Sequence, residues 1–280
     1  MKTIKFYLLA MICMAGLFVT SCSSDDDIQT DNKETKDNGY GNVNNKNGDK
    51  FTVTVNGVSF KMVKVSGGTF QMGATAEQGS DYFDKELPVH QVTLSDYYIA
   101  ETEVTQELWN VVMGINPSRF RGSNKLPVEQ VSWNDCQTFI TKLNVLTGKQ
   151  FRLPTEAEWE FAARGGNLSK GYRYSGSDSY NDVAWCYENS GGKTHEVGAK
   201  APNELGILDM SGNIEEWCQD KYGRYSSDVQ TNPTGPSSGS SRVTRGGEWT
   251  DSGTEDCRVS SRGDASPSSA FSDIGLRLAI

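Results

Sequence analysis

Several acidic side chains and one cysteine lie close together near the end of the chain. Residues 245–257 read RGGEWTDSGTEDC, and within them we single out Glu248, Asp251, Asp256 and Cys257. Carboxylates are hard metal ligands, whereas a thiolate is soft and favours Cu(I), zinc and iron–sulfur clusters. Three acids with one thiol could bind a harder metal, although nothing in this spacing requires one. Cys257 is therefore a candidate catalytic residue without a defined partner.

A second segment is rich in oxygen-bearing side chains. Residues 203–217, NELGILDMSGNIEEW, have neither the period of a helix nor that of a strand, and Gly206 and Gly212 interrupt them. Such a segment cannot satisfy its own backbone polar groups. We expect side-chain hydrogen bonds, glycine turns or a bound cation to fix it in the fold.

The remaining cysteines leave two possibilities open. Beyond the first 22 residues the chain contains Cys136, Cys186, Cys218 and Cys257. Four cysteines allow three complete pairings, and an oxidising compartment would permit them. Buried free thiols are the alternative, and the helical spacing around Cys136 favours that role there.

The N-terminal residues have the features of an export signal. Lys2 and Lys5 precede an apolar run that is too short to span a membrane, and the run ends in VTSC at Cys22. This resembles the lipobox of bacterial lipoproteins, which implies cleavage before Cys22 and its acylation. The acidic residues 25–27 resemble the surface-export tag of Bacteroidetes lipoproteins, or they form a solvated linker.

Composition divides the rest of the chain into a tether and one domain. Residues 23–50 are mostly polar and cannot bury enough apolar surface to offset the conformational entropy that folding would cost them. We therefore predict a flexible tether before a domain at 51–280. The formal net charge of −9 argues against a nucleic-acid partner, which needs clustered Lys and Arg.

The elements that must position these residues follow from local patterns. Alternating residues on either side of Asn56-Gly57 predict a β-hairpin. Thr105, Ser132 and Thr155 each stand where a helix N-cap is expected, and the last two also have an acid at the capping-box position. Beyond Gly166 we expect turns and loops, with exposed loops at 175–189 and 226–241.

Ordered motifs across residues 60–280 resemble those of the formylglycine-generating enzyme family, also called the sulfatase-modifying factor family. They are FQMG at 70–73, ELPVH at 86–90, EVT at 103–105, VSWN at 131–134, RLPTEAEWE at 152–160, the segment 203–217, RGGEW at 245–249 and GLR at 275–277. The resemblance implies a single α+β domain related to the C-type lectin-like fold, with little regular secondary structure.

The resemblance also implies a chemistry that this sequence does not support. Family enzymes oxidise a cysteine of a sulfatase with oxygen and copper, which two thiolates hold in a C-x-x-x-x-C motif. Those two positions fall here on Asp251 and Asp256, and the serine after the glycines is Glu248. Two carboxylates would not hold Cu(I). We therefore expect no copper site, although a small shift of the loop could bring Cys257 into the second position.

The family also binds calcium, and its motif falls on three residues of the central segment. The resemblance implies a structural calcium ion held by Asn213, Glu216 and the carbonyl of Ile214, and hard oxygen ligands suit that ion. The alternative is that Asn213 caps a turn and Glu216 pairs with an arginine. For His90 of the ELPVH motif we expect a structural hydrogen bond.

Two functions are consistent with the sequence. The first is a non-catalytic module, lipid-anchored in the bacterial envelope and most simply in the outer membrane, that binds a protein or a glycan through its loops. The second is a formylglycine-generating oxidase, or a related oxidoreductase, with a substituted active site.

Overall fold

The computed structural model describes residues 44–47, 50–250 and 253–280. The predicted signal at 1–22, with its Cys22, lies outside the described residues, as do most of the predicted tether and Asp251. Within the described ranges, none of the helices combines the length and apolar character that crossing a bilayer requires.

The first sheet contains the predicted hairpin. Its strands are β1 (Asn44–Asn47), β2 (Lys50–Val55), β3 (Val58–Val65) and β6 (Tyr97–Ala100), in that order and all antiparallel. The turn between β2 and β3 places Asn56 at φ 49° and Gly57 at φ 86°, and this left-handed pair suits the twist of a two-residue hairpin loop. The predicted Asn-Gly hairpin is confirmed.

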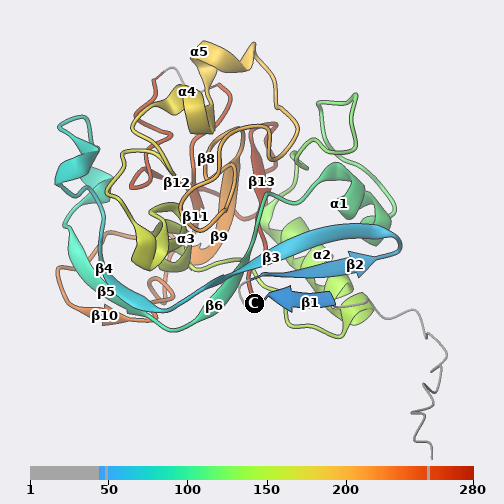
Figure 1. Cartoon of the computed structure of the whole chain (residues 1–280), viewed down its shortest axis with the longest axis horizontal. Coiled ribbons are helices and arrows are strands. Elements are labelled where there is room, and N and C mark those ends of the chain that lie inside the picture. Colours follow the sequence, from blue (N-terminus) through green and yellow to red (C-terminus); the bar gives the residue numbers. More distant parts are fainter. Residues whose placement is uncertain (1–43, 48–49, 251–252) are drawn as a thin grey trace, which may run out of the picture. The chain divides into compact units, whose positions relative to one another are not determined.

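Two helices pack on this sheet (Figure 1) and form the first core. They are α1 (Gln106–Met113) and α2 (Trp133–Thr147). Thr105 and Ser132 accept backbone hydrogen bonds as N-caps, as predicted, and Gly114 and Gly148 end the helices in left-handed conformations. Trp109 of α1 stacks on Phe139 of α2 with ring centroids 4.8 Å apart.

A second core surrounds helix α3 (Glu156–Ala163), which Figure 1 shows near the centre of the domain. Strands β4 (Gly68–Met72), β5 (His90–Leu94) and β10 (Gln230–Thr231) form one sheet beside it. Strands β12 (Arg262–Ala265), β11 (Arg242–Arg245), β9 (Glu215–Lys221) and β13 (Ile274–Leu276) form another, in that order. Apolar side chains of α3 therefore meet both sheets in one buried cluster.

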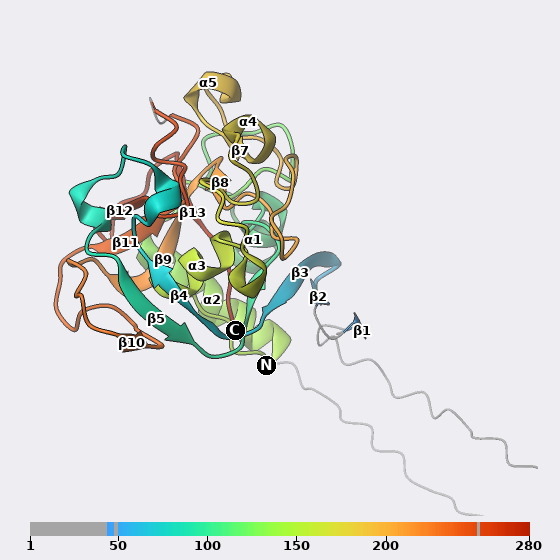
Figure 2. The same ribbon diagram turned by 60° about the vertical axis from the view of Figure 1, so that its left-hand side comes forward.

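The remaining elements are short, and those beyond Gly166 agree with the turns and loops predicted there. They are the 3-10 helices η1 (Ala76–Gln78), η2 (Asp84–Glu86) and η3 (Gly166–Leu168), the helices α4 (Tyr180–Val183) and α5 (Tyr187–Ser190), and the paired strands β7 (Ala184–Trp185) and β8 (Ser211–Gly212). Figure 2 shows the loop between β11 and β12 at the same end of the domain as α4 and α5. The expected α+β domain, with few helices and long loops, is confirmed.

Candidate functional site

The segment that carries Cys257 is fixed by buried arginines. Arg245, in β11, donates to the carbonyls of Ser260 and Val259 at 2.9 and 3.0 Å, and it also pairs with Glu160 of α3. Arg258 makes two hydrogen bonds to Glu86 of η2, at 2.7 and 2.9 Å. Because the charges and their partners are all buried, they hold both ends of this loop against the core.

Glycines bring the two sides of this loop into close contact. Gly247 has φ 70°, and a Cβ built there would lie 2.7 Å from the carbonyl oxygen of Asp256 and 2.8 Å from the nitrogen of Cys257. A side chain at this position would therefore push the backbone at Asp256 away. The Gly-Gly pair of the RGGEW motif thus fixes where Asp256 and Cys257 lie.

Cys257 is in the interior of the domain. Its side chain is 0% exposed and belongs to an apolar cluster with Tyr174, Val183, Ala184 and Cys186. Its carbonyl accepts a hydrogen bond of 2.8 Å from the Ser211 hydroxyl. A second thiol, that of Cys186, thus shares the same cluster, but both are fully buried and neither lines an open groove.

No disulfide joins the described cysteines Cys136, Cys186, Cys218 and Cys257. Burial raises the pKa of Cys136 and Cys218 well above the ordinary value of a thiol, because a thiolate would lose its hydration there. These two side chains pack as small apolar groups, which matches the buried role expected for Cys136.

Of the acids singled out near Cys257, Glu248 and Asp256 lie within the described residues. Glu248 accepts a hydrogen bond from the Thr250 hydroxyl, and burial raises the pKa of Asp256. Among the residues that the structure describes, no group of three or more His, Cys, Asp or Glu side chains is placed to hold a metal ion. The donors in this loop do not fit Cu(I), which needs a pair of thiolates.

Two of the three residues expected to bind calcium, Glu216 and Asn213, have side chains engaged with protein partners. Glu216 accepts hydrogen bonds from Arg277 at 2.7 and 3.0 Å and from the Trp159 indole at 2.7 Å. The side chain of Asn213 accepts from the His195 nitrogen at 2.9 Å. The pairing of Glu216 with an arginine is the alternative that the sequence left open. Because both oxygens of this carboxylate already accept hydrogen bonds, a cation would fit poorly beside Glu216. Calcium binding by Asn213, Ile214 and Glu216 stays a prediction.

Arg277 is also the residue that fixes the central segment in the fold. Its guanidinium donates to the carbonyls of Leu208 and Ala100 at 2.8 and 2.9 Å, in addition to its pairing with Glu216. The side-chain hydrogen bonds expected to fix residues 203–217 are therefore present. Several of them are donated by Arg277, which stands in the GLR motif.

Sequence reasoning missed a pair of buried acids next to this segment. Glu103 accepts a hydrogen bond of 2.8 Å from Asn213, and Asp209 accepts one of 2.6 Å from the Gly198 nitrogen. Burial, together with the negative charge of Asp209, raises the pKa of Glu103 well above its ordinary value. Burial also raises the pKa of Asp209. Both residues stand in the family motifs, but only the fold shows that they face each other.

Comparison with known proteins accounts for these motifs. Residues 49–280 match the Sulfatase-modifying factor enzyme 1-like domain. The chain belongs to the sulfatase-modifying factor family. The match begins within the predicted tether and includes the whole of the predicted domain.

Relatives of this chain are named as a chaperone, as an enzyme and as an inactive enzyme. The chain is 34% identical to the chaperone protein LppX of Paenibacillus barcinonensis, over 79% of this chain and 89% of that one. It is 29% identical to the formylglycine-generating enzyme of Streptomyces coelicolor, over 78% and 88%. It is 28% identical to the inactive C-alpha-formylglycine-generating enzyme 2 of Bos taurus, over 80% and 89%. The family therefore includes both active and inactive members.

A solved structure supports the same fold. Treponema denticola variable protein 1 superposes with a TM-score of 0.75 at 37% sequence identity, covering 82% of this chain and 98% of that one. The sulfatase-modifying factor fold of this chain is thus supported by sequence and by structure.

Proposed function

We propose that this chain is a non-catalytic sulfatase-modifying factor protein that acts as a binding or structural module in the bacterial envelope. One observation carries the proposal. Counted from Gly247, the two thiol positions of the oxidase motif fall on Asp251 and Asp256, while the nearby thiol of Cys257 lies inside an apolar cluster. Without two accessible sulfurs the site has no ligand set for Cu(I).

A turnover assay tests the absence of oxidase activity. We expect the purified full chain, supplied with Cu(I), to leave a C-x-P-x-R peptide unchanged in mass and to consume no oxygen above a protein-free control. Turnover that is abolished by Cys257→Ser but retained in Cys136→Ser would overturn the proposal. Cys136 is the matched control because it is equally buried but lies in α2, in the first core.

The alternative, a formylglycine-generating oxidase with a substituted site, has one observation in its favour. Cys186 and Cys257 belong to the same buried cluster, so a rearranged loop could bring two sulfurs to one metal. In that case Cys186→Ser would abolish turnover together with Cys257→Ser. Equal loss in both variants would identify a cryptic thiol pair.

The envelope location rests on Cys22 and the apolar run before it. Acyl chains contribute about 0.8 kcal/mol for each buried methylene, so two or more chains make a stable anchor. We expect the chain to fractionate with the outer membrane and to incorporate labelled fatty acid. Cys22→Ala should release it, and continued labelling of that variant would refute the anchor.

The binding role rests on loops. Of the two loops expected to be exposed, residues 226–241 form one wall of a cavity, and Tyr187 of the other is well exposed on α5. Trp185 is a poor candidate for a sugar platform, because His195 stacks on its ring at 3.7 Å and Lys200 lies 4.0 Å from the ring centroid. The cavity beside residues 226–241 is therefore the stronger candidate for ligand binding.

A further inference from the structure

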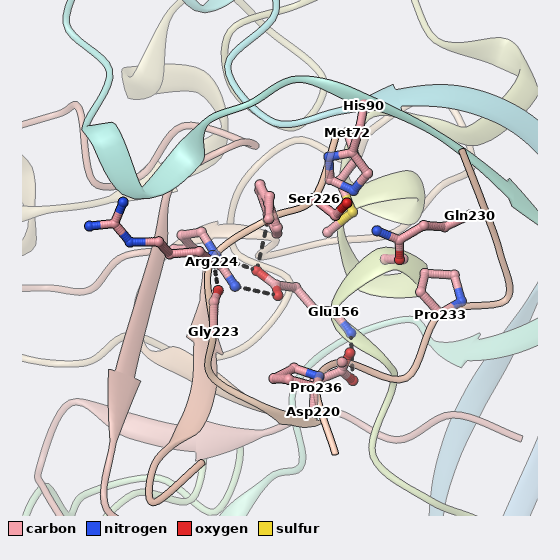
Figure 3. A pocket seen from close by; sticks show the side chains of 14 residues that line it. Met72, His90, Glu156, Asp220, Gly223, Arg224, Ser226, Gln230, Pro233 and Pro236 are labelled. Carbon is pink, nitrogen blue, oxygen red and sulfur yellow. Dashed lines mark hydrogen bonds and ion pairs between the residues drawn. The ribbon is translucent and has the colours of Figure 1, made fainter. Parts of the chain in front are cut away.

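A cavity of about 260 Å³ lies between the first turn of α3, the facing ends of β4 and β5, and the loop that leads into β10 (Figure 3). It is distinct from the segment around Cys257. Its walls combine apolar side chains, such as Met72 and Pro233, with polar and charged ones, among them His90, Asp220, Gln230 and Arg224. Figure 3 shows His90, Gln230 and Asp220 on different sides of the space.

Two deeply buried polar side chains in this wall have one atom each without a protein partner. His90 is 3% exposed, and its Nδ1 lies 3.0 Å from the carbonyl of Pro88. Asp220 is also 3% exposed, and its Oδ2 accepts a hydrogen bond of 3.1 Å from the backbone nitrogen of Glu156. Within residues 50–250 and 253–280, nothing hydrogen-bonds to His90 Nε2 or Asp220 Oδ1. Both residues line the cavity, so these two atoms are available to hydrogen-bond a ligand or water there.

The carboxylate of Glu156 in the wall is already engaged by protein partners. Arg262 makes two hydrogen bonds of 2.7 Å to Glu156, and the Tyr225 hydroxyl donates to the same carboxylate at 2.9 Å. This acid therefore has little remaining capacity for a cation. Burial, and the negative charge of Glu156, raise the pKa of Asp220 to about 8, so Asp220 is mainly protonated at neutral pH and can donate a hydrogen bond.

These features select a class of ligand. An anion would lie near the negative charge of Glu156, while Figure 3 shows the Arg224 guanidinium directed away from His90 and Gln230. The described residues place no set of three ligands for a metal. An amine would require Asp220 to lose its proton. An uncharged ligand with several hydroxyls meets the donors and acceptors of His90, Asp220 and Gln230, while the proline and methionine side chains contact its carbon atoms.

We propose that this cavity binds one sugar ring, either as a free monosaccharide or as the terminal unit of a glycan, with His90, Asp220 and Gln230 hydrogen-bonding its hydroxyls. The volume supports a ligand of that size, because cavities for drug-sized ligands begin at roughly 300 Å³. The proposal rests on the proposed binding role and gives that role a site and a ligand class.

Saturation-transfer NMR on the full chain tests the proposal with a panel of neutral hexoses, N-acetylhexosamines and their methyl glycosides. We expect saturable binding of at least one sugar, weakened about tenfold or more by His90→Phe and by Asp220→Leu. Asp220→Asn should retain most of the affinity because its amide can still donate. Asp264→Asn is the matched control, since it removes an exposed acid outside the cavity and should bind like the wild type.

The panel and the pH separate the remaining outcomes. Binding of methyl glycosides but not of reducing sugars identifies a glycan terminus, and binding of both identifies the ring itself. Wild-type affinity should fall above about pH 8, while that of Asp220→Asn should not. No binding by a folded wild type, or unchanged binding in both His90→Phe and Asp220→Leu, overturns the sugar site. Neither result bears on the copper assay, so failure here and failure of the proposed function are distinguishable.

Discussion

Arg258 and Glu86 form a two-pronged ion pair inside the domain, with Nη2 2.7 Å from Oε1 and Nη1 2.9 Å from Oε2. Both side chains are fully buried, although 172 positions separate them in the chain. Burial alone would raise the pKa of Glu86, but the hydrogen bonds from Arg258, from the Phe83 nitrogen and from the Ser260 hydroxyl, together with the charge of Arg258, lower that pKa below its ordinary value. The pair therefore joins the loop of Cys257 to η2.

Breaking this pair from one side should be costly. Arg258→Met leaves the Glu86 carboxylate buried without its cation, and we expect a loss of about 3–5 kcal/mol in the free energy of unfolding. Adding Glu86→Leu removes the isolated charge, so the double variant should recover part of that loss. Urea unfolding followed by circular dichroism measures both. A double variant as unstable as the sum of the two single variants would contradict the coupling.

Asp220 should make stability depend on pH. Its pKa is about 8 in the fold, against 3.8 for an unburied aspartate, so between these values the folded chain binds more protons than the unfolded chain. The free energy of unfolding must then fall as the pH rises through this window, by up to about 1.4 kcal/mol per pH unit. Glu156 and Glu158 act in the direction of this shift, and Arg262 opposes it.

Asp220→Asn supplies the measurement for that window. We expect the variant to lose the slope between about pH 5 and pH 8 and to exceed the wild type in stability at pH 9. Thermal unfolding at several pH values, with Asp264→Asn as the exposed control, checks this. A wild-type slope that persists in Asp220→Asn would assign the dependence to another group.

Gly247 should tolerate no side chain. Gly247→Ala faces a backbone contact of 2.7 Å in addition to its φ of 70°. Gly148→Ala is the matched control, because Gly148 has φ 66° and nothing within 4 Å of the added Cβ. We expect the control to lose about 1–2 kcal/mol from conformation alone. Gly247→Ala should lose a further 1–3 kcal/mol or so from crowding. Equal losses would show that the loop moves freely.

Chelation decides between the calcium prediction and the ion pair at Glu216. Because Arg277 and Trp159 already engage both carboxylate oxygens, we expect EDTA to leave the melting temperature of the wild type unchanged. A fall in melting temperature that calcium reverses, and that Glu216→Gln abolishes, would instead establish the ion at Asn213, Ile214 and Glu216. Differential scanning calorimetry on both proteins gives the answer.

Local rules account for what the sequence predicted well. The Asn56-Gly57 hairpin, the caps at Thr105, Ser132 and Thr155 and the ends at Gly114 and Gly148 depend on neighbours within a few residues. The family motifs then allowed the fold to be predicted. Each motif is weak evidence alone, but several motifs in a fixed order are specific together.

The site was less predictable because it depends on distant pairings. Nothing in the sequence indicates that Arg258 forms an ion pair with Glu86, or that the side chains of Cys257 and Cys186 pack in the same cluster. The cavity beside Asp220 has the same origin, since its wall comes from β5, α3 and the loop before β10. The pKa of Asp220 follows from that burial rather than from any motif.

Helix α3 has no solvent-facing side of its own, and this has a consequence for how the domain unfolds. Every residue from Glu156 to Ala163 except Glu158 is buried. A helix of eight residues is marginal in water without such surroundings. We therefore infer that α3 becomes helical only when the two sheets pack against it, and that it unfolds only when that packing is lost. Amide protons of α3 should exchange with the slowest class in the domain, at the rate of whole-domain opening.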